Sequence, residues 1–387
     1  MLGVPNLRAG AEARYAARVY FEHGPSFAGF STGPVKAGPG WYRGDLHMHT
    51  AHSDGSCLSN RGARVPCPVF KTLEAAHARG LDFIAVTDHN TASQNDALRE
   101  LAPYFDDLLL IPGREITTFQ GHANVWGPAS PIDFQLGSAR APTLATIQAE
   151  VEKAGGLISI NHPGQPSGES CMGCGWSVKD TDFSRIQAIE AVNGGSLWLP
   201  GGAESGLSGI PFWEARLNAG FRITAVGGSD NHDAGFDPAR PASVGYPTTV
   251  VHAKALSQPA ILAGIRAGHV FIDVSGQRDR LLEVTATASG QTAEMGDALA
   301  APKGEAVTLR VHVTHAAGAV VRLAGDGAKL ADRAEAPLAG DNETATFRLT
   351  GDGRRHWVRA DVRGGSEGRI WMLGNPVYLN APAAPGR

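Results

Sequence analysis

The sequence predicts an α/β barrel followed by an all-β module, and three observations predict it. Between about Asp45 and about Asp273, short apolar runs recur, each ending in a polar cluster, and helical segments lie between them. From about Leu281 the pattern changes to short alternating strands that are separated by glycine-containing turns. The length of 387 residues accommodates about two domains.

The apolar runs have the length and the β-branched content of buried parallel strands. They are Phe83–Val86, Leu108–Ile111, Leu157–Ile160, Ile186–Val192 and Ile223–Val226. The helix candidates start at capping residues or stop at glycine. They are Val69–Arg79, Leu144–Ala154, Pro211–Ala219 and Pro259–Gly268. Alternating strands and helices imply a parallel sheet with right-handed crossovers.

The C-terminal third reads as a small β sandwich. Its expected strands are Leu309–Val313, Val320–Leu323, Ala345–Leu349 and Trp357–Val362. Before the barrel lies a turn-rich segment with a strand-like piece at Tyr15–Phe21. We therefore predict three parts: an N-terminal strand-containing segment (1–40), the barrel (41–278) and a C-terminal β domain (279–387).

The composition narrows the function classes. The net charge is −4, which argues against a protein built to grip a long nucleic acid, because such proteins present a basic face. No stretch approaches the roughly 18 apolar residues that suggest a membrane span. The first residues, MLGVPNLRAGAEARY, lack the apolar core of an export signal. We expect either a cytoplasmic protein or the mature form of a periplasmic or secreted one.

Polar clusters rich in histidine and carboxylate lie at the expected strand ends. They are Asp45-Leu-His47-Met-His49 with His52-Ser-Asp54, Thr87-Asp88-His89, Gly113-Arg-Glu115 with His122 in a following loop, Asn161-His162-Pro163, Glu190-Ala-Val-Asn193 and Ser229-Asp230-Asn231-His232-Asp233. In a parallel barrel, strand ends share the face where active sites are built. Imidazole and carboxylate are ligands for zinc, manganese and iron. Each motif alone could be structural, but the combination predicts a metal-dependent hydrolase.

With these motifs in order over about residues 43–233, the sequence resembles the PHP (polymerase and histidinol phosphatase) superfamily. The resemblance implies a distorted seven-stranded β/α barrel with two or three divalent metal ions. Within the superfamily the chain looks most like the CehA/McbA group, whose members carry a C-terminal β domain. The tail Gly374-Asn375-Pro376-Val377-Tyr378 suits that group.

The resemblance also implies a ligand set. The first metal would be held by His47, His49, Glu115 and Asp230. Glu115 would bridge to a second metal, which His122 and His162 would also hold. A third metal would be held by Asp54, His89 and His232, or these residues would transfer protons if that position holds no ion. His52 is the alternative to Asp54, which we prefer.

Further roles follow from the expected chemistry. Metal binding can lower the pKa of water from about 15.7 to about 7, which gives a metal-bound hydroxide at neutral pH. His232 or Asp54 would protonate the leaving group, and Asp88 would act beside them by orienting a ligand. Glu190 and Asn193 would either contact the substrate or simply end a strand.

The expected substrate is a small phosphodiester or phosphomonoester. The alternative is a carbamate or carboxylic ester of the CehA/McbA type, and a non-enzymatic binding protein is a further one. The expected partner is thus a small anionic or aryl ester rather than a long nucleic acid or a membrane. The oligomeric state stays open.

The four cysteines, Cys57, Cys67, Cys171 and Cys174, allow two disulfides, free thiols or a separate structural zinc. Both cysteine segments are expected in loops on the active-site face. The remaining histidines lie away from the strand ends, and we assign them to the surface or the core. They are His23, His77, His252, His269, His312, His315 and His356.

Overall fold

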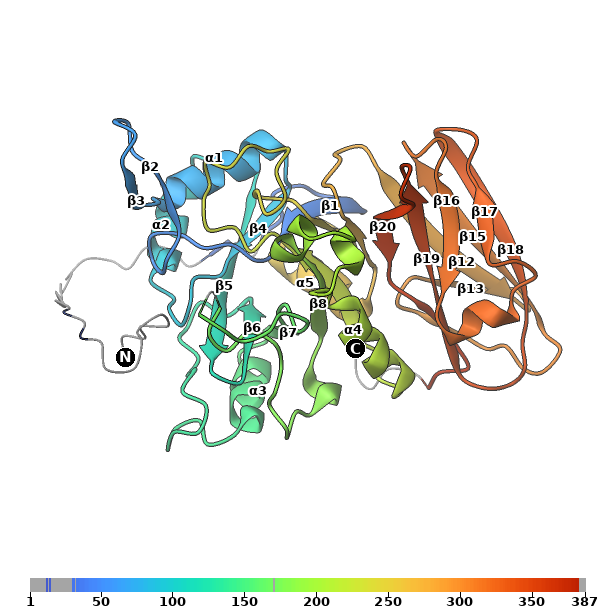
Figure 1. Ribbon diagram of the computed structural model, residues 1–387. Coiled ribbons are helices and arrows are strands. Elements are labelled where there is room, and N and C mark those ends of the chain that lie inside the picture. Colours follow the sequence, from blue (N-terminus) through green and yellow to red (C-terminus); the bar gives the residue numbers. More distant parts are fainter. Residues whose placement is uncertain (1–11, 13, 15–29, 32, 170, 383–387) are drawn as a thin grey trace.

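The computed structural model describes residues 12, 14, 30, 31, 33–169 and 171–382, and it has the α/β class that the sequence predicts. A large central sheet carries few helices, and a β-rich module continues it at the C-terminal end (Figure 1). The expected strand at Tyr15–Phe21 lies outside the described residues. No helix in the described ranges has the length and apolarity that crossing a membrane would require.

The first part of the chain contains β1 to β11. These strands are β1 (Gly40–Asp45), β2 (Ser56–Leu58), β3 (Arg64–Pro66), β4 (Phe83–Val86), β5 (Leu109–Thr118), β6 (Gly121–Trp126), β7 (Leu157–Ile160), β8 (Ala188–Asn193), β9 (Thr224–Gly228), β10 (Thr248–Ala253) and β11 (Val270–Asp273). The runs predicted at β4 and β7 have the observed bounds. Strands β10 and β11 lie outside the apolar runs considered above.

The α-helices of the described residues are α1 (Val69–Arg79), α2 (Gln94–Leu101), α3 (Leu144–Lys153), α4 (Ile210–Asn218) and α5 (Gln258–Ala267). Four of them match predicted helices within about one residue. Helix α1 ends where Gly80 adopts φ 71°, so that its N–H bonds back to Ala76 and His77. Helix α2 escapes the sequence pattern because most of its residues are polar.

The strand directions correct the expectation of an all-parallel sheet. β1, β4 and β5 run parallel, as do β7, β8 and β9. However, β6 pairs antiparallel with both β5 and β7. Only Phe119 and Gln120 separate β5 from β6, and a link of that length makes a hairpin, because a parallel crossover needs about a dozen residues or more.

Strand β9 ends the ladder of paired strands, yet side-chain bonds tie it to β10. The Thr249 hydroxyl accepts from the Gly227 N–H at 2.8 Å and donates to the Gly227 carbonyl at 2.7 Å. Beyond the strand ends, Met48 bridges Asn231 in parallel fashion. The segments that follow β1 and β9 therefore lie side by side, although they are far apart in the sequence.

The C-terminal module contains β12 to β21. Its strands are β12 (Leu281–Ala288), β13 (Gln291–Glu294), β14 (Ala298–Leu299), β15 (Ala306–Thr314), β16 (Val320–Ala324), β17 (Glu335–Pro337), β18 (Asn342–Thr350), β19 (His356–Gly364), β20 (Arg369–Gly374) and β21 (Val377–Leu379). One sheet has the order β13-β12-β15-β18, and the remaining strands extend the large sheet through a β20–β11 pair.

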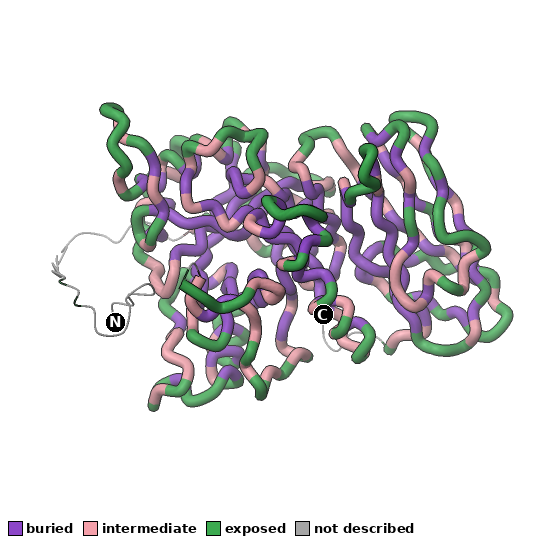
Figure 2. Tube along the Cα trace, in the orientation of Figure 1, coloured by how far each residue is buried: buried purple, intermediate pink, exposed green. Residues whose placement is uncertain are grey.

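An apolar core fills the space between these strands. Leu282 and Val311 come from the four-stranded sheet, and Val358 and Val362 come from β19. All four side chains are fully buried. Figure 2 shows the buried segments running through the central sheet and along the facing strands of the module. Because β11 and β20 pair, the domain boundary near residue 279 stays a prediction.

Candidate metal centre

One carboxylate lies at the centre of the predicted site. Glu115 is fully buried in β5, and five histidines approach it. Its Oε1 lies 3.4 Å from a ring nitrogen of each of three of them, namely His47, His122 and His162. Its Oε2 lies 2.7 Å from His89 Nδ1 and 3.7 Å from His49 Nε2.

The local structure of β5 explains how Glu115 reaches this place. The strand pairs in parallel with β4 as far as Pro112, and from Gly113 it pairs antiparallel with β6. A Cβ at Gly113 would lie 2.8 Å from the Val86 carbonyl, so the change of partner needs glycine there. The sequence suggested that Glu115 follows a short strand, whereas in the structure it lies inside a long one.

His47 and His49 follow β1 in an extended segment. The His49 N–H donates to the Asn231 carbonyl, and the Thr87 N–H donates to the Met48 carbonyl. Asp45, which is fully buried, accepts from the N–H groups of His47 and Ser229. These bonds fix the segment between the ends of β4 and β9, so that both rings face Glu115.

Asp230 contacts both of these histidines from the end of β9. Its Oδ1 lies 3.2 Å from His47 Nε2 and 3.2 Å from His49 Nε2. Its backbone has φ 52°, and His162 has φ 26°, which are conformations that residues other than glycine rarely adopt. Such backbone strain is concentrated at functional sites.

Asp54, His89 and His232 form a more open group with His49. Their ligand atoms lie within 4.8 Å of one another. Asp54 Oδ1 is 3.3 Å from His232 Nε2 and 3.8 Å from His89 Nε2. His52, the alternative to Asp54, instead bonds Ser93 at 2.7 Å at the exposed surface.

His122 and His162 complete the other side of Glu115. His122 lies in β6 and not in the loop that the sequence suggested, because the hairpin after β5 is tight. Its Nε2 donates to the Met172 carbonyl at 3.0 Å. His162 follows β7, next to Asn161, whose side-chain amide donates to Glu115 at 2.8 Å.

Two acidic residues have positions that the sequence reasoning did not resolve. Asp88 accepts hydrogen bonds from Thr50 and Ser53 at 2.6–2.7 Å, so it anchors the loop after His49, and its role in catalysis stays a prediction. Glu190 is buried and lies 2.9 Å from His47 Nδ1, and it also accepts from the His162 N–H. Glu190 is therefore a positioning residue, which its place at a strand end alone does not reveal.

Several polar atoms of the cluster are buried without a hydrogen-bond partner. They are His47 Nε2, His122 Nδ1 and His162 Nδ1. Buried polar groups in proteins almost always have hydrogen-bond partners, because a buried donor or acceptor without a partner costs about 1–3 kcal/mol. Nitrogen and carboxylate oxygen are donors that divalent transition metals accept, so these residues fit bound cations.

Charges within the cluster shift the pKa values of its members in both directions. Burial opposes ionisation of Glu115, but the imidazoles of His89 and His47 hold the pKa of its carboxyl well below the ordinary value. Burial, assisted by charge on His232 and His89, lowers the pKa of His49 to about 3, so its ring is neutral. Burial is outweighed at His232, where Asp54 and Asp230 raise the pKa to about 9.

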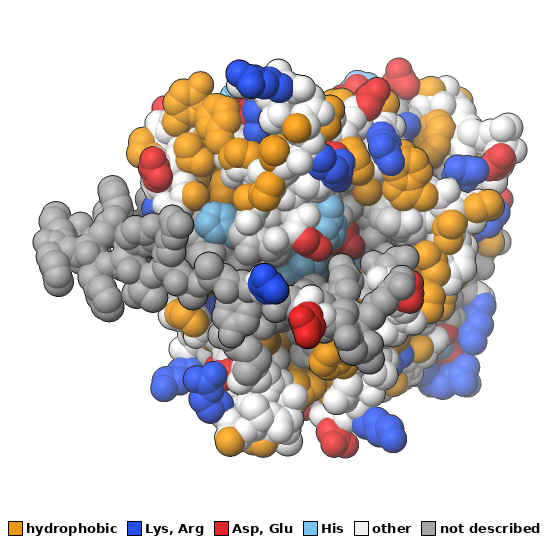
Figure 3. Space-filling model, turned by 60° about the vertical axis from the view of Figure 1, so that its left-hand side comes forward, with side chains coloured by type: hydrophobic (Ala, Val, Ile, Leu, Met, Phe, Trp, Pro, Cys, Tyr) orange, Lys and Arg blue, Asp and Glu red, His pale blue; other side chains and the backbone are white. Residues whose placement is uncertain are grey.

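A cavity of about 750 Å³ opens beside Asp54 and His89. Its described lining includes Phe119, Phe134 and Met172, together with serine, threonine and asparagine side chains, and it contains no lysine or arginine. In Figure 3, histidine side chains come to the surface beside acidic ones near the middle of the face. The cavity gives a small molecule access to the more open part of the cluster.

Comparisons with known proteins add little to this picture. No family model matches the chain. The chain is 27% identical over 150 residues to the uncharacterised protein MJ1587 of Methanocaldococcus jannaschii, a match that covers 38% of this chain and 82% of that protein. A crystal structure of a protein from Bifidobacterium adolescentis, which is proposed to be a metal-dependent phosphoesterase, aligns with TM-score 0.37 and 17% identity. That alignment covers 57% of this chain and 94% of the other. A likeness at this TM-score shows neither a shared fold nor a shared function.

Proposed function

We propose that the protein is a metal-dependent hydrolase of the PHP type, with a small phosphodiester or phosphomonoester as its substrate. The observation that carries the proposal is the buried cluster around Glu115, where ring nitrogens and carboxylate oxygens converge and several lack any hydrogen-bond partner. Such a cluster is costly to bury unless cations bind it. As part of the same proposal, the seven neighbouring strands β1, β4, β5, β6, β7, β8 and β9 form a distorted barrel.

The ligand sets of the proposal follow the distances. His47, His49, Glu115 and Asp230 hold one ion, and Glu115 is shared with a second ion at His122 and His162. Asp54, His89 and His232 hold a third ion or transfer protons. When bound, zinc, manganese or iron ions acidify a coordinated water and neutralise charge on substrate oxygens.

The side chains around the centre set its protonation states. With His47 Nδ1–H donating to Glu190, the lone pair of Nε2 faces Glu115 and Asp230. His232 Nδ1–H donates to the Asp230 carbonyl, and its Nε2 lies beside Asp54. The His232 and Asp54 side chains are 38% and 41% exposed, so this pair is placed to protonate a leaving group.

A second candidate function is hydrolysis of an aryl carbamate or carboxylic ester. The observation that favours it is the cavity lining, where Phe119, Phe134 and Met172 offer apolar contacts and no described lining residue is a lysine or an arginine. In the phosphoester proposal, the positive charge that a phosphate needs would come from the bound ions.

The test begins with protein that is stripped of metal and then reloaded with zinc, manganese or iron. Chromogenic aryl phosphomonoesters, phosphodiesters, carboxylic esters and carbamates are compared by kcat/KM at matched metal content. We expect phosphoester hydrolysis that His47→Ala abolishes and that the remote variant His315→Ala preserves. A carbamate or carboxylic ester with the highest kcat/KM would replace the leading proposal by the second. A folded protein that retains no metal would favour a non-enzymatic binding role.

A further inference from the structure

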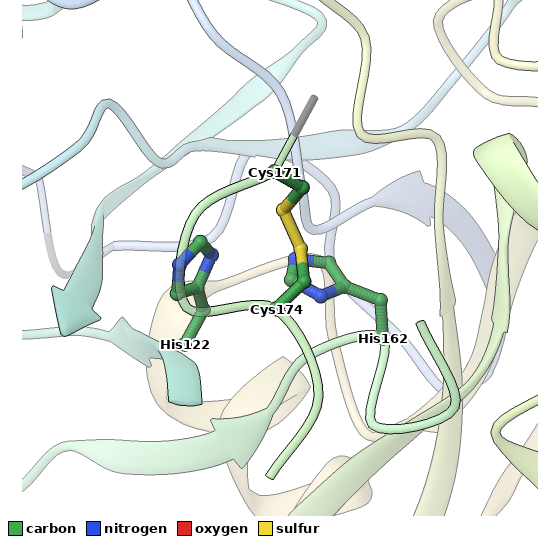
Figure 4. Close-up of side chains that lie close together, drawn as sticks. All are labelled: His122, His162, Cys171 and Cys174. Atoms are coloured by element: carbon green, nitrogen blue, oxygen red, sulfur yellow. A yellow bond between two sulfur atoms is a disulfide. The ribbon is translucent and has the colours of Figure 1, made fainter. Parts of the chain in front are cut away.

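The CxxC motif lies against the second metal position. The structure pairs Cys171 with Cys174 and Cys57 with Cys67, which selects disulfides among the alternatives that the sequence left open. Ligand atoms of Cys171, Cys174, His122 and His162 all lie within 4.8 Å of one another. Figure 4 shows the disulfide lying between the two imidazole rings.

We propose that reduction of the Cys171–Cys174 disulfide creates a Cys2His2 metal site with His122 and His162. The redox state of this cysteine pair then decides whether the two imidazoles serve Glu115 or the thiolates. The site itself needs only the four side chains, whereas its effect on catalysis rests on the proposed hydrolase function.

The loop that carries the motif is held closely over His122. The Met172 carbonyl accepts from His122 Nε2 at 3.0 Å, and the Ser177 N–H donates to the Gln120 carbonyl at 2.7 Å. Gly173 has φ 86°, and a Cβ there would lie 1.9 Å from the Thr118 carbonyl. The cysteines are therefore fixed against the β5–β6 hairpin by contacts that do not involve the disulfide.

The two histidines have the unsatisfied atoms that a ligand site requires. His122 is 3% exposed and His162 is 2% exposed, and the Nδ1 atom of each is buried without a hydrogen-bond partner. Cys174 is buried, while Cys171 is half-buried. A small thiol reductant therefore has a route to the disulfide through Cys171.

The chemistry of the switch balances with a dithiol as the reductant. The dithiol becomes a disulfide and delivers two electrons and two protons; the Cys171–Cys174 bond breaks, and two thiols form. On binding zinc, both thiols release their protons to solvent, because the thiolate is the ligand form. A disulfide offers no such anionic ligand, whereas two thiolates with two imidazoles form a set that zinc binds tetrahedrally.

The second disulfide provides a matched comparison. Cys57 and Cys67 are both buried and join the β2–β3 hairpin to the segment that follows it. In the described part of the chain, neither belongs to a group of side chains with metal-ligand spacing. We therefore assign Cys57–Cys67 a structural role and Cys171–Cys174 the regulatory one.

Loss of the imidazoles from the centre would weaken it. His122 and His162 each lie 3.4 Å from Glu115 Oε1, so ligands that turn toward the thiolates leave the shared carboxylate with fewer partners. We expect reduction to lower hydrolytic activity about 10-fold or more, by analogy with the loss of groups that orient metal ligands.

The experiment uses cobalt(II) as the probe, because thiolate–cobalt bonds give a charge-transfer absorption in the near ultraviolet. Metal-free protein is titrated with cobalt before and after treatment with a dithiol, and released thiols are counted. We expect the absorption only in the reduced protein. It should persist in Cys57→Ser/Cys67→Ser and be lost in Cys171→Ser/Cys174→Ser.

The outcomes separate the inference from the function. Reduced wild-type protein that binds cobalt without the absorption would overturn the inference, and so would absorption that survives in Cys171→Ser/Cys174→Ser. If that variant does not fold, reduced Cys57→Ser/Cys67→Ser, whose only thiols are the pair in question, decides alone. Phosphoester hydrolysis is assayed on the same samples in both the oxidised and the reduced state. The cobalt–thiolate absorption without hydrolysis in either state would support the Cys2His2 site and contradict the proposed function.

Discussion

The proposed metal centre and the C-terminal module both contain histidines beside carboxylates, but the hydrogen bonding of these histidines differs between the two regions. In the module, His356 is 5% exposed, and its two ring nitrogens bond Asp326 and Asp352 at 2.7 and 3.0 Å. In the centre, His47 Nε2 and His162 Nδ1 are buried with no hydrogen-bond partner. Burial alone therefore does not distinguish a candidate ligand from a structural histidine, whereas a buried ring nitrogen without a hydrogen-bond partner does.

Buried charge shows the same contrast. Arg359 is 3% exposed and donates to Asp361 from two nitrogens and to Glu214 of α4 from a third. This group of opposite charges is complete within the protein. Around Glu115 the carboxylates of Asp230 and Glu190 add negative charge. Burial opposes charge on His47, but these carboxylates outweigh it and raise the pKa of His47 well above its ordinary value. We propose that bound cations balance the negative charge of this centre.

The largest expected effect comes from Glu115→Gln. The substitution keeps the volume of the side chain but removes the charge that two metal positions share, so we expect activity to fall about 100-fold or more, beyond the loss seen for outer-shell changes. Metal content by mass spectrometry and kcat/KM measure the effect, and thermal unfolding checks that the fold remains cooperative. Full metal content with wild-type turnover would show that Glu115 is no ligand.

Next in size is Arg359→Met, which should act on stability and not on the centre. It leaves the buried Asp361 with Arg363, 3.9 Å away, as its remaining partner of opposite charge, so we expect a loss of about 3–5 kcal/mol in the free energy of unfolding. Urea denaturation measures this, with Arg322→Met as the control. Arg322 pairs with Glu335 at an exposed position, where the loss should stay below about 1 kcal/mol. Equal losses in the two variants would contradict the contrast drawn here.

A smaller stability effect is expected from Cys57→Ser/Cys67→Ser. The disulfide joins residues 10 apart, and the chain-entropy model gives about 3 kcal/mol for a loop of this length. The variant should keep its metal, because neither cysteine belongs to a ligand group in the described residues. Chemical denaturation and metal analysis together test this. Loss of metal with unchanged stability would reverse the roles assigned to the two disulfides.

Much of the fold was predictable from periodicity, since β4 and α1 have the observed bounds and the shift to alternating strands falls near β12. The sequence could not show that β5 runs on past Gly113, because its polar second half does not read as a buried strand. It therefore placed His122 in a loop. Strand β10 was missed as well, although its pairing with β1 helps to shape the sheet.

The sequence pointed to histidines and carboxylates that lie together in the structure, but it did not show which of them contact one another. His-x-His spacing and strand-end positions identified the histidines that meet at Glu115. Nothing in the residue pattern indicates that Glu190 lies against His47, or that Asp88 accepts hydrogen bonds from Thr50 and Ser53. These contacts join segments more than 30 residues apart, and only the packing of the sheet determines which carboxylate reaches which partner.

The smallest effect is expected at His312, a histidine that we assign to structure. Its Nε2 donates to Asn342 and its Nδ1 to Glu283, and since both partners are acceptors, the ring is held as an imidazolium. The hydrogen bond to Asn342 raises its pKa above the ordinary value, against a smaller effect of burial and with help from Glu283. A raised histidine pKa stabilises the fold fully below the unfolded-state value of about 6.5, and this stabilisation is lost as pH rises through the folded-state value.

The Tm difference between wild type and His312→Gln should therefore be larger at about pH 5.5 than at about pH 8.5. The double variant His312→Ala/His315→Ala should keep its full metal content, because the module lies away from Glu115. A Tm difference that grows with pH would refute the imidazolium, and loss of metal from the double variant would place a ligand outside the proposed centre.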